Sequence, residues 1–245
     1  MHAKLFNAGC LAVVLSAASA LPAHAQSMTW MDRGFVNINF GAQEASRSLD
    51  AGSQFSIYNE QGSLTTTQPI DGGALFDIGG GYKVWKNLAV GLSFTRVQSD
   101  GDITIAASVP DPNFFDRTRP LTGTAGNAEH SEQAIHLQGT WVMPVTDKFD
   151  AAFSFGPTIF NVKQEVATAI TVTEPGPTLG DVTMAEEKKT TVGVNFGVDL
   201  NYFFTPKIGG GLLVRYAWGS ADLDSSSESL TVGGFQIGAG LRLRF

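Results

Sequence analysis

The feature that most constrains this chain is a two-residue period that recurs along most of its length. In the clearest segment, 190–204, Val192, Val194 and Phe196 alternate with small or polar residues. The last segment keeps this period up to the final residue, Phe245. Successive side chains of a β-strand point to opposite faces, so the period predicts strands with one apolar face. The segments with this period are 34–43, 73–84, 88–98, 132–143, 149–163, 190–204, 208–220 and 231–245.

The connections between these segments alternate in length without exception. The short connections are 85–87, 144–148 and 205–207, and the long ones are 44–72, 99–131, 164–189 and 221–230. A soluble sandwich has no reason to place every short turn at one end, whereas an outer-membrane barrel does so with an even number of strands. The sequence therefore predicts an all-β fold: an eight-stranded antiparallel up-and-down transmembrane β-barrel with short periplasmic turns and long extracellular loops.

The second face of the predicted strands consists mostly of Gly, Ala, Ser, Thr, Asn and Gln. Side chains just fill the interior of an eight-stranded barrel, and small polar residues suit it. Aromatic residues lie near the predicted strand ends, where membrane barrels have interfacial girdles, although the core of a soluble β protein is the alternative. The expected girdle residues are Trp85, Trp141, Tyr202, Phe204, Tyr216 and Trp218.

Two local signals add detail to this strand pattern. Pro157 interrupts the segment 149–163 and predicts a bulge or a site above the membrane there, because proline cannot donate to a strand ladder. The stretch 55–66 has a weak hairpin pattern inside a long connection. Such a hairpin would extend the first two strands above the membrane.

The first 25 residues have the pattern of a cleaved signal peptide. Lys4 precedes an apolar stretch too short to span a membrane, and Ala23 and Ala25 form a small-x-small cleavage site. Cys10 raises the alternative of a lipoprotein, but Asn7 occupies the position where a lipobox needs Leu. The predicted domains are a signal peptide (1–25), an N-terminal periplasmic segment (26–33) and a barrel domain (34–245).

The signal peptide, the eight strands and the final GLRLRF resemble the small outer-membrane β-barrel proteins, the group of the OmpA transmembrane domain, OmpX and OmpW. The resemblance implies a monomer in the bacterial outer membrane, in contact with lipid and lipopolysaccharide. It also implies that periplasmic chaperones and the barrel-assembly machinery act during biogenesis, the latter reading Leu241, Leu243 and Phe245 as its signal. Because the chain stops at Phe245, we expect no OmpA-like peptidoglycan-binding domain.

The four long connections are all acidic, with a net charge of −3 each. An acidic rim attracts cations and repels lipopolysaccharide phosphates unless divalent cations bridge them. In the last connection, Asp222, Asp224 and Glu228 offer oxygen ligands for calcium or magnesium, although a solvated acidic loop is the simpler interpretation. No basic stripe exists, so we expect no nucleic-acid partner. We also expect no cofactor and no resident metal.

Seven ionisable residues occupy the alternate strand positions that are expected to face the interior. They are Asp77, Lys83, His136, Asp199, Arg215, Arg242 and Arg244. Buried charges must be paired, so we interpret these residues as a polar network that plugs the barrel, with a conducting pathway as the alternative. The turn at 205–207 places Gly197 opposite Arg215, with Asp199 one diagonal step away.

One inward-facing histidine is a candidate for catalysis. The turn at 144–148 places His136 near Ser154 and Gly156, with Gln138 beside them. Such a His–Ser pair is similar to barrel lipases, but those sites face lipid, and no acid is placed to orient His136. The sequence has no G-x-S-x-G, H-E-x-x-H or P-loop.

We therefore predict a non-enzymatic barrel that contributes to envelope structure or surface interaction through its acidic loops. The alternative is a narrow small-solute or cation channel of the OmpW-like type. A lipid-modifying barrel enzyme is the third hypothesis, and it depends on His136 alone.

Overall fold

The structure, a computed structural model, describes residues 29–226 and 228–245, so the predicted signal peptide (1–25) lies outside it. The described residues contain no helix that is long and apolar enough to cross a membrane. They form the strands β1 (Gly34–Ile57), β2 (Glu60–Trp85), β3 (Leu88–Asp111), β4 (Phe114–Pro144), β5 (Phe149–Thr173), β6 (Thr178–Phe203), β7 (Ile208–Ala221) and β8 (Leu230–Arg244).

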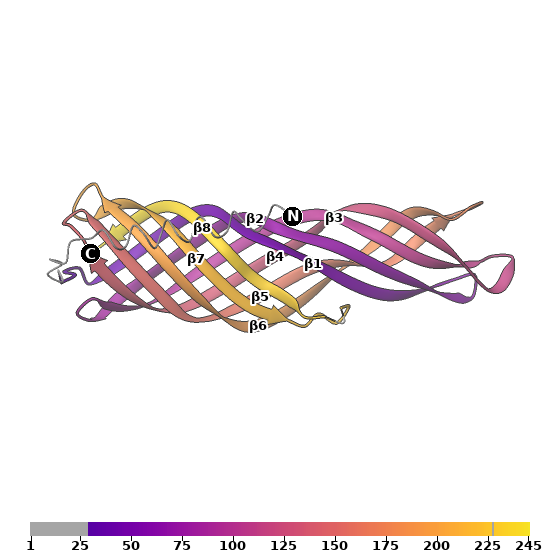
Figure 1. The fold of residues 1–245 in the computed structure, drawn as a ribbon, viewed down its shortest axis with the longest axis horizontal. Coiled ribbons are helices and arrows are strands. Elements are labelled where there is room, and N and C mark those ends of the chain that lie inside the picture. Colours follow the sequence, from indigo (N-terminus) through magenta and orange to yellow (C-terminus); the bar gives the residue numbers. More distant parts are fainter. Residues whose placement is uncertain (1–28, 227) are drawn as a thin grey trace, which may run out of the picture.

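These strands close into one antiparallel barrel in which each strand pairs with its neighbours in sequence (Figure 1). β1 pairs with β8 from Phe35↔Arg244 to Glu44↔Phe235, so the first and last strands complete the wall. Closure satisfies the backbone hydrogen bonds that a lipid environment would otherwise leave unmade. The predicted fold class, an eight-stranded up-and-down barrel, is confirmed.

The strands β1 to β6 are much longer than predicted, with 24 to 31 residues each. The expectation that 44–72, 99–131 and 164–189 are loops is wrong, because most of each stretch continues its two strands as an antiparallel hairpin. The first hairpin turns at Tyr58 and Asn59, whose φ angles of 55° and 61° are those of a tight hairpin turn. The hairpin predicted in this stretch is confirmed.

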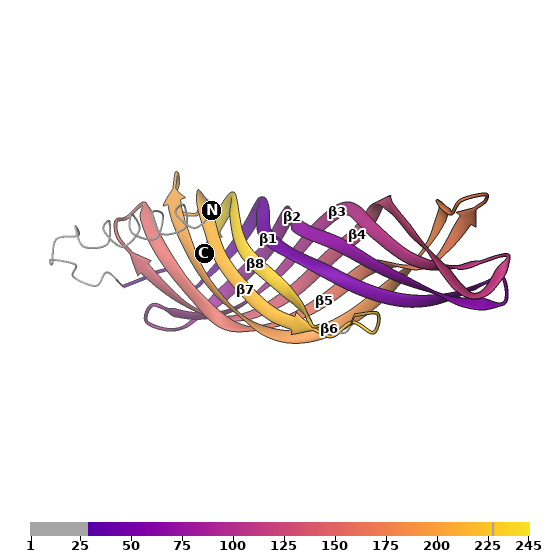
Figure 2. The same cartoon turned by 45° about the vertical axis from the view of Figure 1, so that its right-hand side comes forward.

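β7 and β8 have only 14 and 15 residues, so the wall is complete only in the part of the molecule next to the short turns, which we call its lower part and which lies on the left in Figure 1. Beyond them the six longer strands continue as three hairpins, to the right in Figures 1 and 2. We call residues 46–71, 99–130 and 164–190 the extension, and the eight-stranded part the body. The long connection expected between β7 and β8 is indeed a loop in its described residues, unlike the three long connections that form hairpins.

The expectation of a bulge at Pro157 is wrong. β5 passes through Pro157 and keeps its register with β6, where Pro157 lies opposite Val194. Pairing with β4 lapses beside Pro157 and resumes in the same register at Phe155, because proline has no N–H to donate. The register shifts of β5 lie higher, after Ala167 and Ile170.

The two faces of the wall exchange their chemistry between the body and the extension. In the body, large apolar side chains such as Leu92 and Phe196 are exposed on the outside, and polar side chains such as Asn39 and Thr95 are buried inside. In the extension the interior is apolar. Its buried cluster consists of Phe55, Leu64, Ile103, Ile105, Ala107, Val109, Leu121, Ala128, Ala167 and Ile170.

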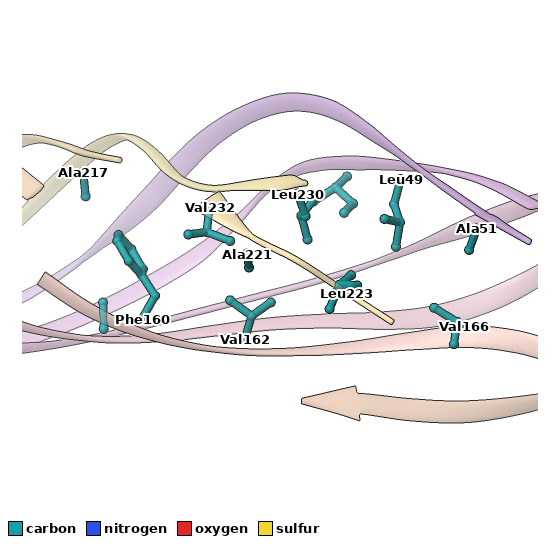
Figure 3. Packing of buried hydrophobic residues seen from close by; sticks show 12 residues of the cluster. Leu49, Ala51, Phe160, Val162, Val166, Ala217, Ala221, Leu223, Leu230 and Val232 are labelled. Carbon is teal, nitrogen blue, oxygen red and sulfur yellow. The ribbon is translucent and has the colours of Figure 1, made fainter. Parts of the chain in front are cut away.

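A second apolar cluster fills the interior where β7 and β8 end (Figure 3). It includes Leu49 of β1, Phe160 and Val162 of β5, and Val232 of β8. Leu223, from the loop after β7, is buried in the same cluster. Burial of each such Leu or Phe side chain away from water contributes about 1.5–3 kcal/mol. The cluster therefore holds the loop against residues of β1, β2, β4, β5, β7 and β8.

Candidate functional site

The centre of the body contains a buried hydrogen-bonded network around Arg242 of β8, which we call the lower network. The guanidinium of Arg242 donates to Asp199 Oδ1 at 2.9 Å, to Asn39 Oδ1 at 2.6 Å and to Asn201 Oδ1 at 2.6 Å. Arg242 is only 1% exposed. The charge of Arg242 is thus paired with Asp199, and its guanidinium is hydrogen-bonded to side chains of β1 and β6, as burial of a charge requires.

Arg215 of β7 is the second cation of the lower network. Its Nη1 donates to Asp77 Oδ2 at 2.8 Å and to Thr95 Oγ1 at 2.9 Å. Asn39 Nδ2 donates to the other oxygen of Asp77 at 2.8 Å and so joins the two ion pairs. The sequence placed Asp199 one diagonal step from Arg215, but the acid that pairs with Arg215 is Asp77, from β2.

His136 also belongs to the lower network and is fully buried. Its Nδ1 lies 2.8 Å from Thr158 Oγ1 and its Nε2 lies 3.1 Å from Thr95 Oγ1. The predicted proximity of His136 to Ser154 is wrong, because His136 lies opposite Thr158 in the ladder, and Gln138 is the residue that reaches Ser154, at 3.5 Å. The turn at the end of β4 lies one residue further along the chain than the sequence-based register assumed, and this changes the residue opposite His136 from Gly156 to Thr158.

Above the lower network, the inward-facing residues of five strands are apolar. Phe160 meets the ring of His136 edge-on, with ring centroids 6.5 Å apart and an interplanar angle of 88°. This apolar layer consists of the buried side chains Leu75, Val97, Ala134, Phe160, Val162 and Ala217. Each of them follows or precedes a network residue by two positions or a few more on its own strand, so on these strands the layer separates two polar zones. Between β7 and β8 the two zones adjoin, because Arg215 and Gln236 are ladder partners.

The upper polar zone, which we call the junction network, lies where the body meets the extension. Its centre is the buried carboxylate of Glu132, which accepts from Gln43 Nε2 at 3.0 Å, Arg47 Nη2 at 2.6 Å and Gly233 N at 3.0 Å. His130 Nε2 lies 3.0 Å from the same carboxylate. The φ of Gly233 is 87°, a value suited to glycine, at a position where the backbone N–H turns inward.

A chain of side-chain amides extends the junction network around the interior. Gln164 Oε1 lies 2.7 Å from His130 Nδ1, and Gln164 Nε2 donates to Gln68 Oε1 at 2.7 Å. On the other side, Gln236 Nε2 donates to Gln43 Oε1 at 2.7 Å. The network therefore links β1, β2, β4, β5 and β8 across the interior.

Two of the seven predicted interior residues, Lys83 and Arg244, lie at the short-turn end. Arg244 Nη1 lies 3.7 Å from Asp150 Oδ2, and Asp150 accepts a hydrogen bond from Asn201 of the lower network at 2.7 Å. Lys83 Nζ donates to the carbonyl oxygen of Trp30. The guanidinium carbon of Arg244 lies 3.8 Å from the ring centroid of Phe203, and its Nε lies 3.4 Å from Asp32 Oδ2. Trp30 is 3% exposed, so the described part of the N-terminal segment packs into this mouth of the barrel.

The outer wall of the body carries the residues that the sequence assigned to lipid contact. Leu241 and Phe245, two of the three residues expected to be the assembly signal, are exposed there, and Leu243 is half-buried. The predicted girdle residues all have exposed side chains: Trp85, Trp141, Tyr202, Phe204, Tyr216 and Trp218. An interfacial girdle needs such positions at the ends of the apolar band.

The three acidic residues considered as cation ligands do not converge on one point. Asp222 Oδ1 accepts from Ser229 Oγ at 2.5 Å, Asp224 Oδ1 lies 3.6 Å from Lys189 Nζ, and Glu228 is exposed. Within the described chain, no group of three or more His, Cys, Asp or Glu residues is placed to hold a metal ion. The arrangement is that of a solvated acidic loop.

Sequence reasoning found the charged members of the lower network and missed most of their neutral partners. The partners on predicted strands occupy the alternate positions that face the interior, and this position was the one signal that could have identified them. Others lay in stretches expected to be loops, where no phase was assigned. The missed residues are Asn39, Gln43, Arg47, Gln68, Thr95, His130, Glu132, Thr158, Gln164, Asn195, Asn201 and Gln236.

Comparison with known families agrees with this architecture. A family model described as an outer membrane protein beta-barrel domain matches residues 8–242. The chain therefore belongs to the outer membrane protein β-barrel family, and the resemblance to small outer-membrane barrels is confirmed. Among curated proteins, no relative matches.

Several solved structures are similar in fold. The attachment invasion locus protein Ail of Yersinia pestis, in complex with the heparin analogue sucrose octasulfate, is 12% identical with a TM-score of 0.39, over 86% of this chain and 99% of that one. Neisserial surface protein A is 11% identical with a TM-score of 0.42, over 86% and 97%. The outer membrane protease OmpT of Escherichia coli is 8% identical with a TM-score of 0.47, over 89% and 98%. These likenesses concern the fold alone.

Proposed function

We propose that the protein is a non-enzymatic barrel of the bacterial outer membrane, with a sealed lumen and an extension that presents an interaction surface outside the cell. The observation that carries the sealed lumen is the stacking of two hydrogen-bonded networks around an apolar layer. The proposed lipid partners, outer-membrane lipid and lipopolysaccharide, surround the body at the aromatic girdle. We expect the barrel to act as a monomer.

A conducting path would have to pass both networks and the apolar side chains beside them. Its opening would separate Arg242 from Asp199 and Arg215 from Asp77, pairs that are buried and close at 2.9 and 2.8 Å. Removal of one partner from such a buried pair costs about 3–5 kcal/mol. Water would also have to enter the apolar layer, where Phe160 is 1% exposed. These costs favour a plug over a pore.

The buried position of His136 supports a non-enzymatic role. A catalytic group needs a cleft that admits substrate. His136 is 0% exposed, and its two ring nitrogens already meet the hydroxyl groups of Thr95 and Thr158. This imidazole is held inside the lower network rather than presented to lipid or water.

The length of the strands supports a surface role for the extension. About 10 residues suffice for a tilted strand to cross a bilayer. β3 has 24 residues, and its upper part keeps apolar residues such as Ile103 and Ile105 inside while Thr104 and Ala106 face outward. An apolar core between hairpins gives the extension its own stability in water. It therefore presents a defined surface rather than mobile loops.

The test is the single-channel conductance of the refolded mature protein in a planar bilayer, after a heat-dependent gel shift shows that it is folded. A porin refolded in the same way provides the positive control. We expect no steps from the wild-type protein, and none from a folded Arg215→Ala variant. Steady steps with cation preference would contradict the sealed lumen and favour the narrow channel. If the Arg215→Ala variant showed conductance steps and the wild type did not, the interior would contain a gated path rather than a plug.

A further inference from the structure

The two ends of the body differ in charge. The loop between β7 and β8, at the upper end, carries acidic residues and no basic one. At the short-turn end, on the left in Figure 1, each turn exposes one lysine: Lys86 between β2 and β3, Lys148 between β4 and β5, and Lys207 between β6 and β7. We call these three residues the lysine ring. Because the turns alternate around the barrel, the ring surrounds its lower rim.

The acidic residues at the same end do not neutralise the lysine ring. Asp32 Oδ2 lies 3.4 Å from Arg244 Nε, and Asp150 Oδ2 lies 3.7 Å from Arg244 Nη1, so both face one arginine. Asp147 is exposed in the same turn as Lys148.

Lysines of the described chain form ion pairs only at the opposite end of β5 and β6. The lysines in these pairs are Lys163, Lys188 and Lys189. The ammonium groups of the lysine ring are therefore available to an external anion.

The backbone fixes two members of the ring as neighbours. Arg244 Nε donates to Pro206 O at 2.8 Å, and its Nη2 donates to Asp147 O at 3.2 Å, so one side chain ties two turns together. The carbonyl of Lys148 accepts from Phe203 N at 2.7 Å, and that of Lys207 accepts from Arg244 N at 3.0 Å. Lys148 and Lys207 thus flank the end of β6.

The lysine ring lies next to the lower part of the aromatic girdle. Lys86 Nζ lies 4.7 Å from the ring centroid of Trp85, and the exposed Phe204 lies in the same chain reversal as Lys207. Aromatic side chains of membrane proteins lie at the level of the lipid headgroups. A lysine beside them rests its carbon chain on apolar surface and extends its ammonium group to the phosphate layer.

We propose that the lysine ring binds the phosphate groups of anionic phospholipids in the periplasmic leaflet, so that the barrel gathers lipids such as phosphatidylglycerol around its short turns. The inference rests on the proposed position of the body in the outer membrane. A lysine close to an anionic membrane surface strengthens binding by about fivefold. Zwitterionic lipids gain less, because their own ammonium group lies beside the phosphate.

The distribution of these cations favours a lipid leaflet over an acidic protein. Lys86, Lys148 and Lys207 belong to three separate turns around the rim rather than to one continuous face. The mouth that they surround is occupied by Trp30, which is 3% exposed and whose N–H donates to Asn87 Oδ1 at 3.1 Å. A leaflet that encloses the barrel can meet all three turns at once.

The test uses two tryptophans at opposite ends of the wall as reporters. One full-length mature protein keeps Trp85 as its single tryptophan, a second keeps Trp218, and the others are changed to Phe. Each is refolded into vesicles of phosphatidylglycerol and phosphatidylcholine, with bromine on the acyl chains of one lipid or the other. Because both leaflets have the same composition, a difference in quenching between the two ends comes from the protein.

We expect brominated phosphatidylglycerol to be preferred about threefold at Trp85 and not at Trp218, where the neighbouring loop is acidic. In 1 M salt, where the Debye length is about 3 Å, the preference at Trp85 should disappear. Soluble polyglutamate should not change it. Loss of the preference on addition of polyglutamate would assign the ring to an acidic protein instead.

Matched variants in the Trp85 protein identify the cation. Lys86→Gln should abolish the preference for phosphatidylglycerol, and Lys86→Arg should retain it. Lys188→Gln, an exposed lysine at the other end of the wall, is the control and should leave the preference unchanged. If a single-tryptophan protein shows no heat-dependent gel shift, the two lipids that co-purify with the wild type and with a Lys86→Gln, Lys148→Gln, Lys207→Gln variant are compared instead. The variant should retain less phosphatidylglycerol.

Three results would overturn the proposal: equal quenching by both lipids at Trp85, the same preference at Trp218, or an unchanged preference in Lys86→Gln. In the co-purification experiment, equal lipid ratios would do the same. Equal quenching by both lipids at both ends refutes this inference alone, since the barrel is then still in the bilayer. Absence of quenching by either lipid would refute the proposed membrane position, and the inference with it.

Discussion

The body and the extension are built from the same strands and have opposite chemistry. On β3, odd-numbered residues face the interior from Ala89 to Val109. In the body this interior face carries Thr95, and the outer face carries Leu92, which is 58% exposed. In the extension the interior face carries Ile105, which is 0% exposed, and the outer face is polar. The exchange takes place along one continuous strand.

This difference shows that a two-residue period defines two faces but not the medium that each face meets. Apolar side chains lie wherever water is excluded. For a barrel in lipid that place is the outer wall, and the lumen takes the polar residues. Above the lipid, water surrounds the wall, so the apolar face must turn inward and pack against the other hairpins. The same rule gives opposite patterns on one strand.

The largest expected effect comes from the polar interior of the body. Arg215→Ala should lower the free energy of unfolding by about 3–5 kcal/mol, because it leaves the buried carboxylate of Asp77 without its cation. Urea titration of the refolded protein in lipid vesicles measures this change. The control is the double variant Asp77→Leu with Arg215→Met, which removes both charges and should recover most of the loss. A single variant as stable as the wild type would show that the pair is not buried.

The apolar interior of the extension should respond almost as strongly, but locally. Ile105→Ala creates a cavity in a packed core and should cost about 2–4 kcal/mol. We expect rapid proteolysis of the hairpins in intact vesicles, with the heat-dependent gel shift of the body retained. Thr104→Ala, on the outer face of the same strand, is the matched control and should leave cleavage unchanged. Equal cleavage in both variants would mean that the extension has no core.

A lysine scan on one face of β3 would sharpen the contrast between the two media. Leu92→Lys places a charge on the lipid-facing wall and should cost about 2–4 kcal/mol. Thr104→Lys has the same outward phase in the extension and should change stability by about 0.5 kcal/mol or less, because it faces water. Urea unfolding of both variants checks the difference. Similar costs would place both positions in the same environment.

The smallest expected effect is at the hairpin tips. Arg119 Nη2 lies 2.5 Å from Glu174 Oε1, and its hydrogen bonds hold the pKa of Glu174 below the ordinary value of 4.5. A carboxyl group with a lowered folded-state pKa stabilises the fold above its unfolded pKa, and this contribution is lost as pH falls through the folded pKa. We therefore expect the contact between these two tips to hold at neutral pH and to weaken only below pH 4.5.

The NMR shift of the Gly176 amide, which lies 3.2 Å from Glu174 Oε2, follows this titration. In Glu174→Gln the same amide should not titrate in this range. A midpoint at or above 4.5 would contradict the proposed effect of Arg119.

Much of the body was predictable from the sequence. Alternation in segments such as 190–204 and 231–245 predicted the strands, and the short connections predicted the turns, because both are local properties. The extension was missed because its apolar residues were judged against the pattern of a lipid-facing strand. In 99–131 the inward residues Ile103 and Ile105 keep the same period, but a loop was assumed there.

The partners within the lumen were less predictable than its members. The interior phase identified Asp77, Asp199, Arg215 and Arg242, but pairing across the barrel depends on the register of every intervening strand. The observed register between β4 and β5 places His136 opposite Thr158 rather than beside Ser154, because the turn lies one residue further along the chain than expected. Register shifts within a ladder occur after Gln43 on β1 and near Gly101 on β3, and no local pattern marks them.

By itself, the sequence determined the number of strands in this protein, their order and, in the body, the face on which each strand residue lies, because chain geometry couples these to a two-residue period. Closure of the barrel followed from the need to satisfy backbone groups in lipid. Only the tertiary structure decided which charges pair, where the interior changes from polar to apolar, and that β7 and β8 stop short beside a free edge of β1. These features depend on contacts between residues far apart in sequence, such as Arg215 and Asp77, whose distance is set by the whole barrel.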